Sequence, residues 1–103
     1  MSTCSANPAH LSDSALVDLK DSLHKNWELA PDGKSITRTF TFKGFAKATY
    51  TANAAAFLSD NTGHHADIAF GWGYCKITYT THEADRLSEV DFTCARKLDA
   101  MLA

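Results

Sequence analysis

Two stretches decide the fold of this chain: ITRTFTF at residues 36–42 and WGYCKITYTTH at residues 72–82. Both alternate β-branched or aromatic residues with a second set of side chains, the period-two pattern of a β-strand. In the second stretch, one face receives Cys75, Ile77 and Tyr79. The opposite face receives Trp72, Tyr74, Lys76, Thr78, Thr80 and, at the end of the predicted strand, His82. We therefore expect two strands that each cover a core with one face.

Shorter signals complete the predicted sheet. Pro-Asp-Gly-Lys at residues 31–34 predicts a turn, because proline fixes φ and glycine accepts positive φ. Residues 27–42 therefore predict a β-hairpin. Residues 68–70 predict a short further strand, and the polar segment 60–67 before it predicts a loop or turn.

Helical periodicity occupies three other segments. Ser12 can cap a helix over about residues 13–25, whose leucines recur at helical spacing. Residues 45–59 are rich in alanine and predict a second helix. Ser88, with Asp91 three residues later, predicts a capping box at the start of a last helix that runs to near the end of the sequence.

The predicted helix over residues 45–59 has two apolar stripes, whereas a surface helix normally has one. One stripe can pack on the sheet, and the other needs a second partner, such as another subunit. The two stripes are Phe45, Ala48, Ala52 and Ala56, and Ala46, Tyr50, Ala54 and Phe57.

Together these elements predict an α+β fold in the order α-β-β-α-β-β-α. We expect a two-layer sandwich, a four-stranded antiparallel sheet with three helices on one face. The 103 residues suffice for one domain, over residues 11–103, with residues 1–10 as a flexible tail. Domains of this size often gain stability by oligomerising.

Composition narrows the classes of function. The formal net charge is -2 and lysines and arginines do not cluster, which argues against direct nucleic-acid binding. We expect no membrane span and no secretory signal, because long apolar runs and a basic start are absent. The widely spaced cysteines Cys4, Cys75 and Cys94 suggest reduced thiols and a cytoplasmic protein.

Three histidines in the second half are candidates for proton transfer. His64 and His65 follow the second predicted helix, and His82 ends the long predicted strand. Imidazole has an ordinary pKa of about 6.5, so two histidines in one pocket could supply an acid and a base. The alternative is that they are inert surface side chains. Asp60 and Asp91 flank the group, and Asp91 has a purely structural alternative as a helix cap.

A metal site is the competing reading of the same residues. Three histidines and an aspartate could ligate zinc, but zinc-binding histidines on one element rarely lie side by side. Adjacent residues of an extended segment also point to opposite sides. We therefore expect no metal at these residues. Cys75 lies on the face of its predicted strand that we expect to pack on the core, so we expect a small buried side chain rather than a nucleophile.

The spacing of these residues resembles that of the pterin-4a-carbinolamine dehydratases, and the resemblance extends over about residues 11–103. The positions that carry it are Asp60, His64, His65, Trp72, His82 and Asp91. The sequence departs from the family pattern where Ala66 replaces a usual proline, Gly63 a usual asparagine, and Asp85-Arg86 a usual Gly-Gly. The family's acid at the position of Asp60 is more often glutamate. Loss of the proline predicts a looser loop around the histidines.

The resemblance implies an enzyme that dehydrates a 4a-hydroxytetrahydropterin to a quinonoid dihydropterin without metal or cofactor. It implies proton transfer by His64 and His82, with His65 holding the pterin and sharing in the transfer. Asp60, Trp72 and Asp91 are the implied substrate-binding or orienting residues. A homodimer or homotetramer is implied too. The competing function is a non-catalytic relative that binds a protein, assisting dimerisation of a transcription factor or assembly of a carboxylating enzyme.

Overall fold

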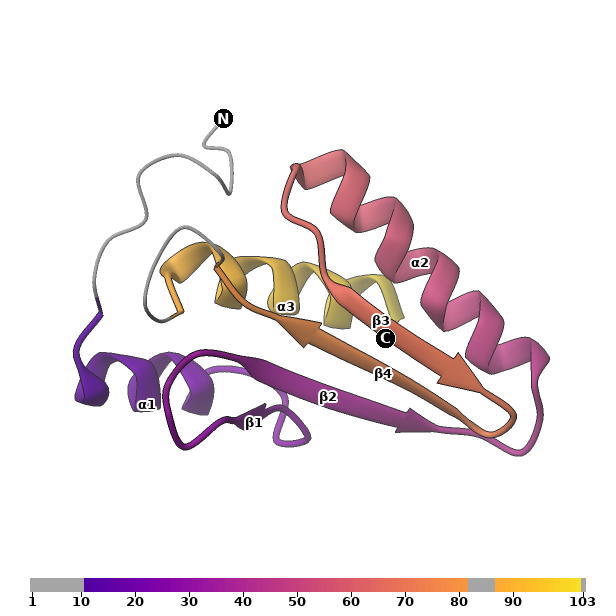
Figure 1. The fold of residues 1–103 in the computed structure, drawn as a ribbon, viewed down its shortest axis with the longest axis horizontal. Helices are drawn as coiled ribbons and strands as arrows, with labels where there is room; N and C mark the ends of the chain where they lie inside the picture. The colour runs from indigo at the N-terminus through magenta and orange to yellow at the C-terminus, as the bar shows by residue number, and fades with distance from the viewer. Residues whose placement is uncertain (1–10, 82–86, 103) are drawn as a thin grey trace.

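The computed structural model describes residues 11–81 and 87–102 and contains three helices and four strands within them (Figure 1). The predicted N-terminal tail, His82 and the Asp85-Arg86 departure lie outside these residues. In chain order the elements are α1 (Asp13–Asp21), β1 (Glu28–Leu29), β2 (Ile36–Thr41), α2 (Ala46–Thr62), β3 (Asp67–Gly71), β4 (Tyr74–Tyr79) and α3 (Glu89–Leu102).

The four strands form one antiparallel sheet in the order β1-β2-β4-β3, so β2 and β4 are the central pair. Alternation along β4 buries Cys75, Ile77 and Tyr79 completely, as the sequence predicts. Three helices cover this face of the sheet (Figure 1). The predicted α+β sandwich is therefore confirmed.

The hydrophobic core lies between that sheet face and the helices. Its largest fully buried side chains include Trp27, Tyr79 and Phe92, from the segment before β1, from β4 and from α3. Trp27 is tied to α3 because its indole N–H donates to Asp99 Oδ2 at 2.8 Å. This bond holds the C-terminal part of α3 against the segment before β1, while Phe92 packs the N-terminal part of the helix into the core. The first turn of α3 lies next to the end of β4, and this junction holds the candidate site.

Helix α2 is longer than predicted and buries a different stripe. It continues to Thr62, so Asp60 lies on the helix rather than in a loop. Its buried apolar residues are Ala48, Ala52, Ala55 and Leu58, while Phe45 and Ala56 of the predicted stripe are exposed. The reason is that a helix with 3.6 residues per turn keeps one face inward only when steps of four are balanced by steps of three. The predicted stripe took a second step of four, from Ala52 to Ala56, where the buried face continues to Ala55.

Two other predicted boundaries are wrong for local reasons. Helix α1 ends at Asp21 instead of residue 25, because the Leu23 N–H bonds the Lys20 carbonyl three residues back, while the Ser22 hydroxyl donates to the Leu19 carbonyl. The predicted strand at 72–82 begins only at Tyr74. Trp72 and Gly73 form the turn of the β3–β4 hairpin, with Gly73 at φ 86°.

Candidate active site

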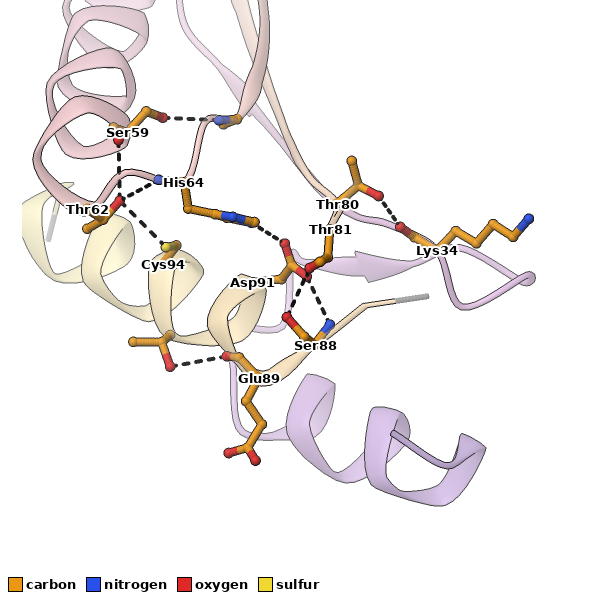
Figure 2. Close-up of polar contacts among 12 residues, drawn as sticks. Lys34, Ser59, Thr62, His64, Thr80, Thr81, Ser88, Glu89, Asp91 and Cys94 are labelled. Carbon is orange, nitrogen blue, oxygen red and sulfur yellow. Dashed lines mark hydrogen bonds and ion pairs between the residues drawn. The ribbon is translucent and has the colours of Figure 1, made fainter. Parts of the chain in front are cut away.

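Asp91 lies in the first turn of α3 and is fully buried. Its Oδ2 accepts the Ser88 backbone N–H at 3.0 Å, which is half of the predicted capping box. The same oxygen accepts the Thr81 hydroxyl, and the Thr81 and Ser88 hydroxyls lie 2.9 Å apart (Figure 2). One oxygen of Asp91 is therefore occupied by groups that hold the start of α3 against the end of β4.

The other carboxylate oxygen of Asp91 faces His64. His64 Nε2 lies 2.5 Å from Asp91 Oδ1, and His64 is only 7% exposed (Figure 2). Its ring is nearly parallel to that of Tyr79, at an interplanar angle of 12° and a centroid distance of 6.0 Å. Because a carboxylate accepts hydrogen bonds, Nε2 is the nitrogen assigned the hydrogen, and Nδ1 then carries the lone pair in the neutral ring.

His65 points the other way. Its Nε2 lies 3.2 Å from Asp60 Oδ1, and both side chains are mostly exposed. The structure therefore divides the predicted site into a buried pair, His64 with Asp91, and a surface pair, His65 with Asp60. A surface pair of this kind is worth about 0–1 kcal/mol of stability, so it does little to hold the fold.

Trp72 is not brought to the buried pair within one copy of the chain. It is 72% exposed, at the β3–β4 turn. His64 precedes the opposite end of β3, and four steps along an extended strand span about 13 Å. Trp72 is therefore close to His64 in the sequence, but the length of β3 separates the two residues in space.

His82 follows Thr81 directly and belongs to the segment outside the described residues. Thr81 itself is buried and shares the Asp91 carboxylate with His64. The chain therefore enters the segment that carries His82 from beside the buried pair.

Sequence reasoning missed Thr81, Tyr79 and Ser59 as neighbours of the site. Tyr79 and Thr81 could have been found from the sequence, because both continue the alternation that places Cys75 and Ile77 on the buried face of the sheet. Thr81 is the one polar residue at the end of that series, and a buried hydroxyl needs a hydrogen-bond partner. Ser59, whose hydroxyl bonds the far end of the histidine loop, left no periodic signal.

Other groups with chemical potential lie apart from these histidines. Cys75 is a fully buried free thiol, and burial raises its pKa, which suppresses the reactive thiolate. A cavity of about 430 Å³ lies between β2 and the C-terminal part of α3, lined in part by Arg38, Phe40 and Asp99. Within residues 11–81 and 87–102, no group of three or more His, Cys, Asp or Glu side chains is placed so that it could hold a metal ion. In the same ranges, every helix is too short or too polar to cross a membrane.

Comparison with known proteins assigns the family. The family model described as Pterin 4 alpha carbinolamine dehydratase matches residues 9–101. The chain belongs to this family. A Paracoccus denitrificans (strain Pd 1222) protein, provisionally named pterin-4-alpha-carbinolamine dehydratase, is 50% identical over 74 residues, covering 72% of this chain and 69% of that protein.

Two solved structures of this dehydratase family or its relatives share the fold. A transcriptional coactivator/pterin dehydratase from Brucella melitensis superposes with a TM-score of 0.82 at 26% identity, covering 92% of this chain and 100% of that one. A pterin dehydratase-like protein identified as a RuBisCO assembly factor in the alpha-carboxysome gives a TM-score of 0.63 at 29% identity, covering 76% and 90%. A protein of similar structure is thus described by an assembly role.

Proposed function

We propose that this chain dehydrates a 4a-hydroxytetrahydropterin to a quinonoid dihydropterin. The observation that carries the proposal is the buried His64–Asp91 pair, held next to Thr81, from which the chain continues into His82. A buried carboxylate is costly unless it is well hydrogen-bonded. The hydrogen bonds of Asp91 meet that need, and one of them fixes the Nε2 edge of the His64 ring.

The reaction needs one proton delivered and one proton removed. The C4a–O bond breaks with its electrons on oxygen, which takes a proton and leaves as water. N5 loses its proton, and its electron pair forms the new double bond to C4a. Protons balance, and imidazoles near neutral pH suit both transfers.

The hydrogen bond between His64 and Asp91 is the basis on which we assign the three histidines their roles in the reaction. With Nε2 donating to Asp91, the Nδ1 lone pair of His64 suits the base that removes the N5 proton. His82 then delivers the proton to the leaving hydroxyl from the other side of the ring. His65, exposed beside Asp60, holds the pterin where the site meets solvent.

A turnover assay with synthetic 4a-hydroxytetrahydropterin tests this proposal. His64→Ala and His82→Ala should each lower kcat by about 10²–10⁴-fold, because each removes a proton-transfer group. His65→Ala should act mainly on KM. His24→Ala, which removes an exposed histidine after α1, is the matched control and should retain wild-type turnover. Full activity in His64→Ala and His82→Ala would refute the proposal.

A second candidate function is that of a non-catalytic binding or assembly protein. It is favoured by the likeness to the RuBisCO assembly factor and by aromatic side chains exposed on α2. Tyr50 is 68% and Phe57 66% exposed on the outer stripe of that helix. We propose that this stripe joins copies of the chain into a dimer or tetramer. An inactive wild type in the turnover assay would favour the assembly function.

A further inference from the structure

The four-residue loop that carries both histidines is closed at its two ends by one residue, Ser59. The Ser59 carbonyl accepts the N–H of Gly63, where α2 ends, at 2.9 Å. The Ser59 hydroxyl accepts the N–H of Ala66, just before β3, at 3.1 Å (Figure 2). His64 and His65 are the two residues between these anchor points.

The bond from Ser59 to Ala66 differs from those of the neighbouring hydroxyls on α2. Thr51 and Thr62 donate to carbonyls four residues earlier, Lys47 and Leu58, both at 2.9 Å, which is the common use of a helical hydroxyl. Ser59 Oγ instead serves a residue seven positions later, outside the helix, and Ser59 is only 4% exposed. Its hydroxyl is therefore a tie between the helix and the loop.

Gly63 gives the loop the conformation that this tie needs. Its φ is 75°, in the left-handed region, so the chain turns sharply after Thr62. The Thr62 hydroxyl lies 3.4 Å from the His64 backbone nitrogen, a long contact, which leaves Ser59 as the stronger anchor.

We propose that Ser59 is a positioning residue for His64, an inference that rests on the proposed dehydratase function. The imidazole of His64 reaches Asp91 at 2.5 Å and lies flat along Tyr79, so its alignment depends on where the loop backbone sits. Without the Ser59 tie, Ala66 is released and the loop gains freedom at its far end. Displacement of a reacting group by about 1 Å can cost about 10²-fold in rate, so even a small shift matters.

The decisive experiment combines loss and rescue of the tie. Ser59→Ala should lower kcat by about fivefold to twentyfold with a smaller change in KM, because the site loses alignment rather than pterin contacts. Ala66→Pro in the Ser59→Ala background should return kcat to within about twofold of wild type. Proline fixes φ and has no N–H, so it stiffens the loop without needing the acceptor. Ser59→Thr, which keeps the hydroxyl, should also stay near wild type.

A spectroscopic readout separates this inference from the proposed function. The hydrogen-bonded Nε2–H proton of His64 should give a downfield NMR resonance, assigned by its loss in His64→Ala. Ser59→Ala should shift or broaden it, and the Ala66→Pro rescue should restore it. Thr51→Val is the matched control, since it removes an equally buried α2 hydroxyl that bonds only within the helix.

The outcomes decide the two ideas separately. An unchanged resonance together with wild-type kcat in Ser59→Ala would overturn the positioning role. Equal losses in Thr51→Val would overturn it as well, because they would point to general weakening of α2. If the wild type has no dehydratase activity, the proposed function fails, while the NMR comparison still tests whether Ser59 holds His64.

Discussion

Two regions of this molecule treat their side chains in opposite ways. Where β4 ends, polar groups are buried and satisfied: Asp91 is fully buried and bonds Thr81, Ser88 and His64. Along the outer side of α2 and at the β3–β4 turn, large aromatic side chains are left in solvent. These include Phe45, Tyr50, Phe57 and Trp72, each more than half exposed.

Neither arrangement is the one that stability alone would favour. Burying a carboxylate and an imidazole costs free energy that their hydrogen bonds only partly return. A hydrophobic pair of similar volume at the same place often gives the fold equal or greater stability. Exposed aromatic groups gain their stabilisation only when another surface covers them. The contrast matches the two proposed roles, catalysis in the first region and self-association in the second.

The largest effect is expected from breaking the buried region at Asp91. Asp91→Ala removes the acceptor shared by the His64 ring, the Thr81 hydroxyl and the Ser88 N–H. Leaving such groups buried and unsatisfied should lower the free energy of unfolding by about 3 kcal/mol, measured by urea denaturation. Turnover should fall at least about 100-fold.

Asp67→Ala is the control for that experiment, since it removes an exposed carboxylate of β3 and should change stability by less than about 0.5 kcal/mol. A wild-type unfolding midpoint in Asp91→Ala would show that the network contributes nothing to the fold, and the contrast between the two regions would lose its basis.

A smaller effect is expected from the exposed region. Replacing Tyr50 and Phe57 together by serine should leave the monomer's stability within about 0.5 kcal/mol, because both side chains are mostly in solvent. The same change should raise the dissociation constant between copies at least tenfold, because aromatic residues dominate interface energetics. Sedimentation over a range of concentrations measures this shift. A stable wild-type monomer at all concentrations would remove self-association from the comparison.

The sequence predicts the architecture well because periodicity determines it. The alternation in β2 and β4 and the helical spacing of the leucines report which side of those elements is buried, and the structure contains all seven predicted elements in the predicted order. The failures lie in the buried stripe of α2 and at the ends of elements. Asp60 was expected in a loop and lies on α2, because the chain does not turn until Gly63 adopts positive φ.

The site was less accessible to sequence reasoning. The resemblance to the dehydratases named His64 and Asp91, and the structure places them in contact. It also named Trp72, which lies at the far end of β3, because a spacing along the chain does not say where an extended strand carries a residue. The missing proline predicted a looser histidine loop. The structure shows that Ala66 has an N–H, which proline lacks, and that this N–H donates to the Ser59 hydroxyl oxygen.

The smallest predicted effect concerns Cys75, which lies on β4 between the two regions and is fully buried. Burial raises the pKa of its thiol above the ordinary value of 9.0, so at high pH the folded chain binds more protons than the unfolded chain. Stability should therefore be unaffected below about pH 8 and decline as the pH rises through the unfolded thiol's pKa towards the folded one. Cys75→Ala should lose stability at neutral pH through its small cavity, yet decline less steeply between about pH 8.5 and 10. Denaturation midpoints at several pH values measure both slopes, and identical slopes would show that this thiol ionises as readily in the folded chain as in water.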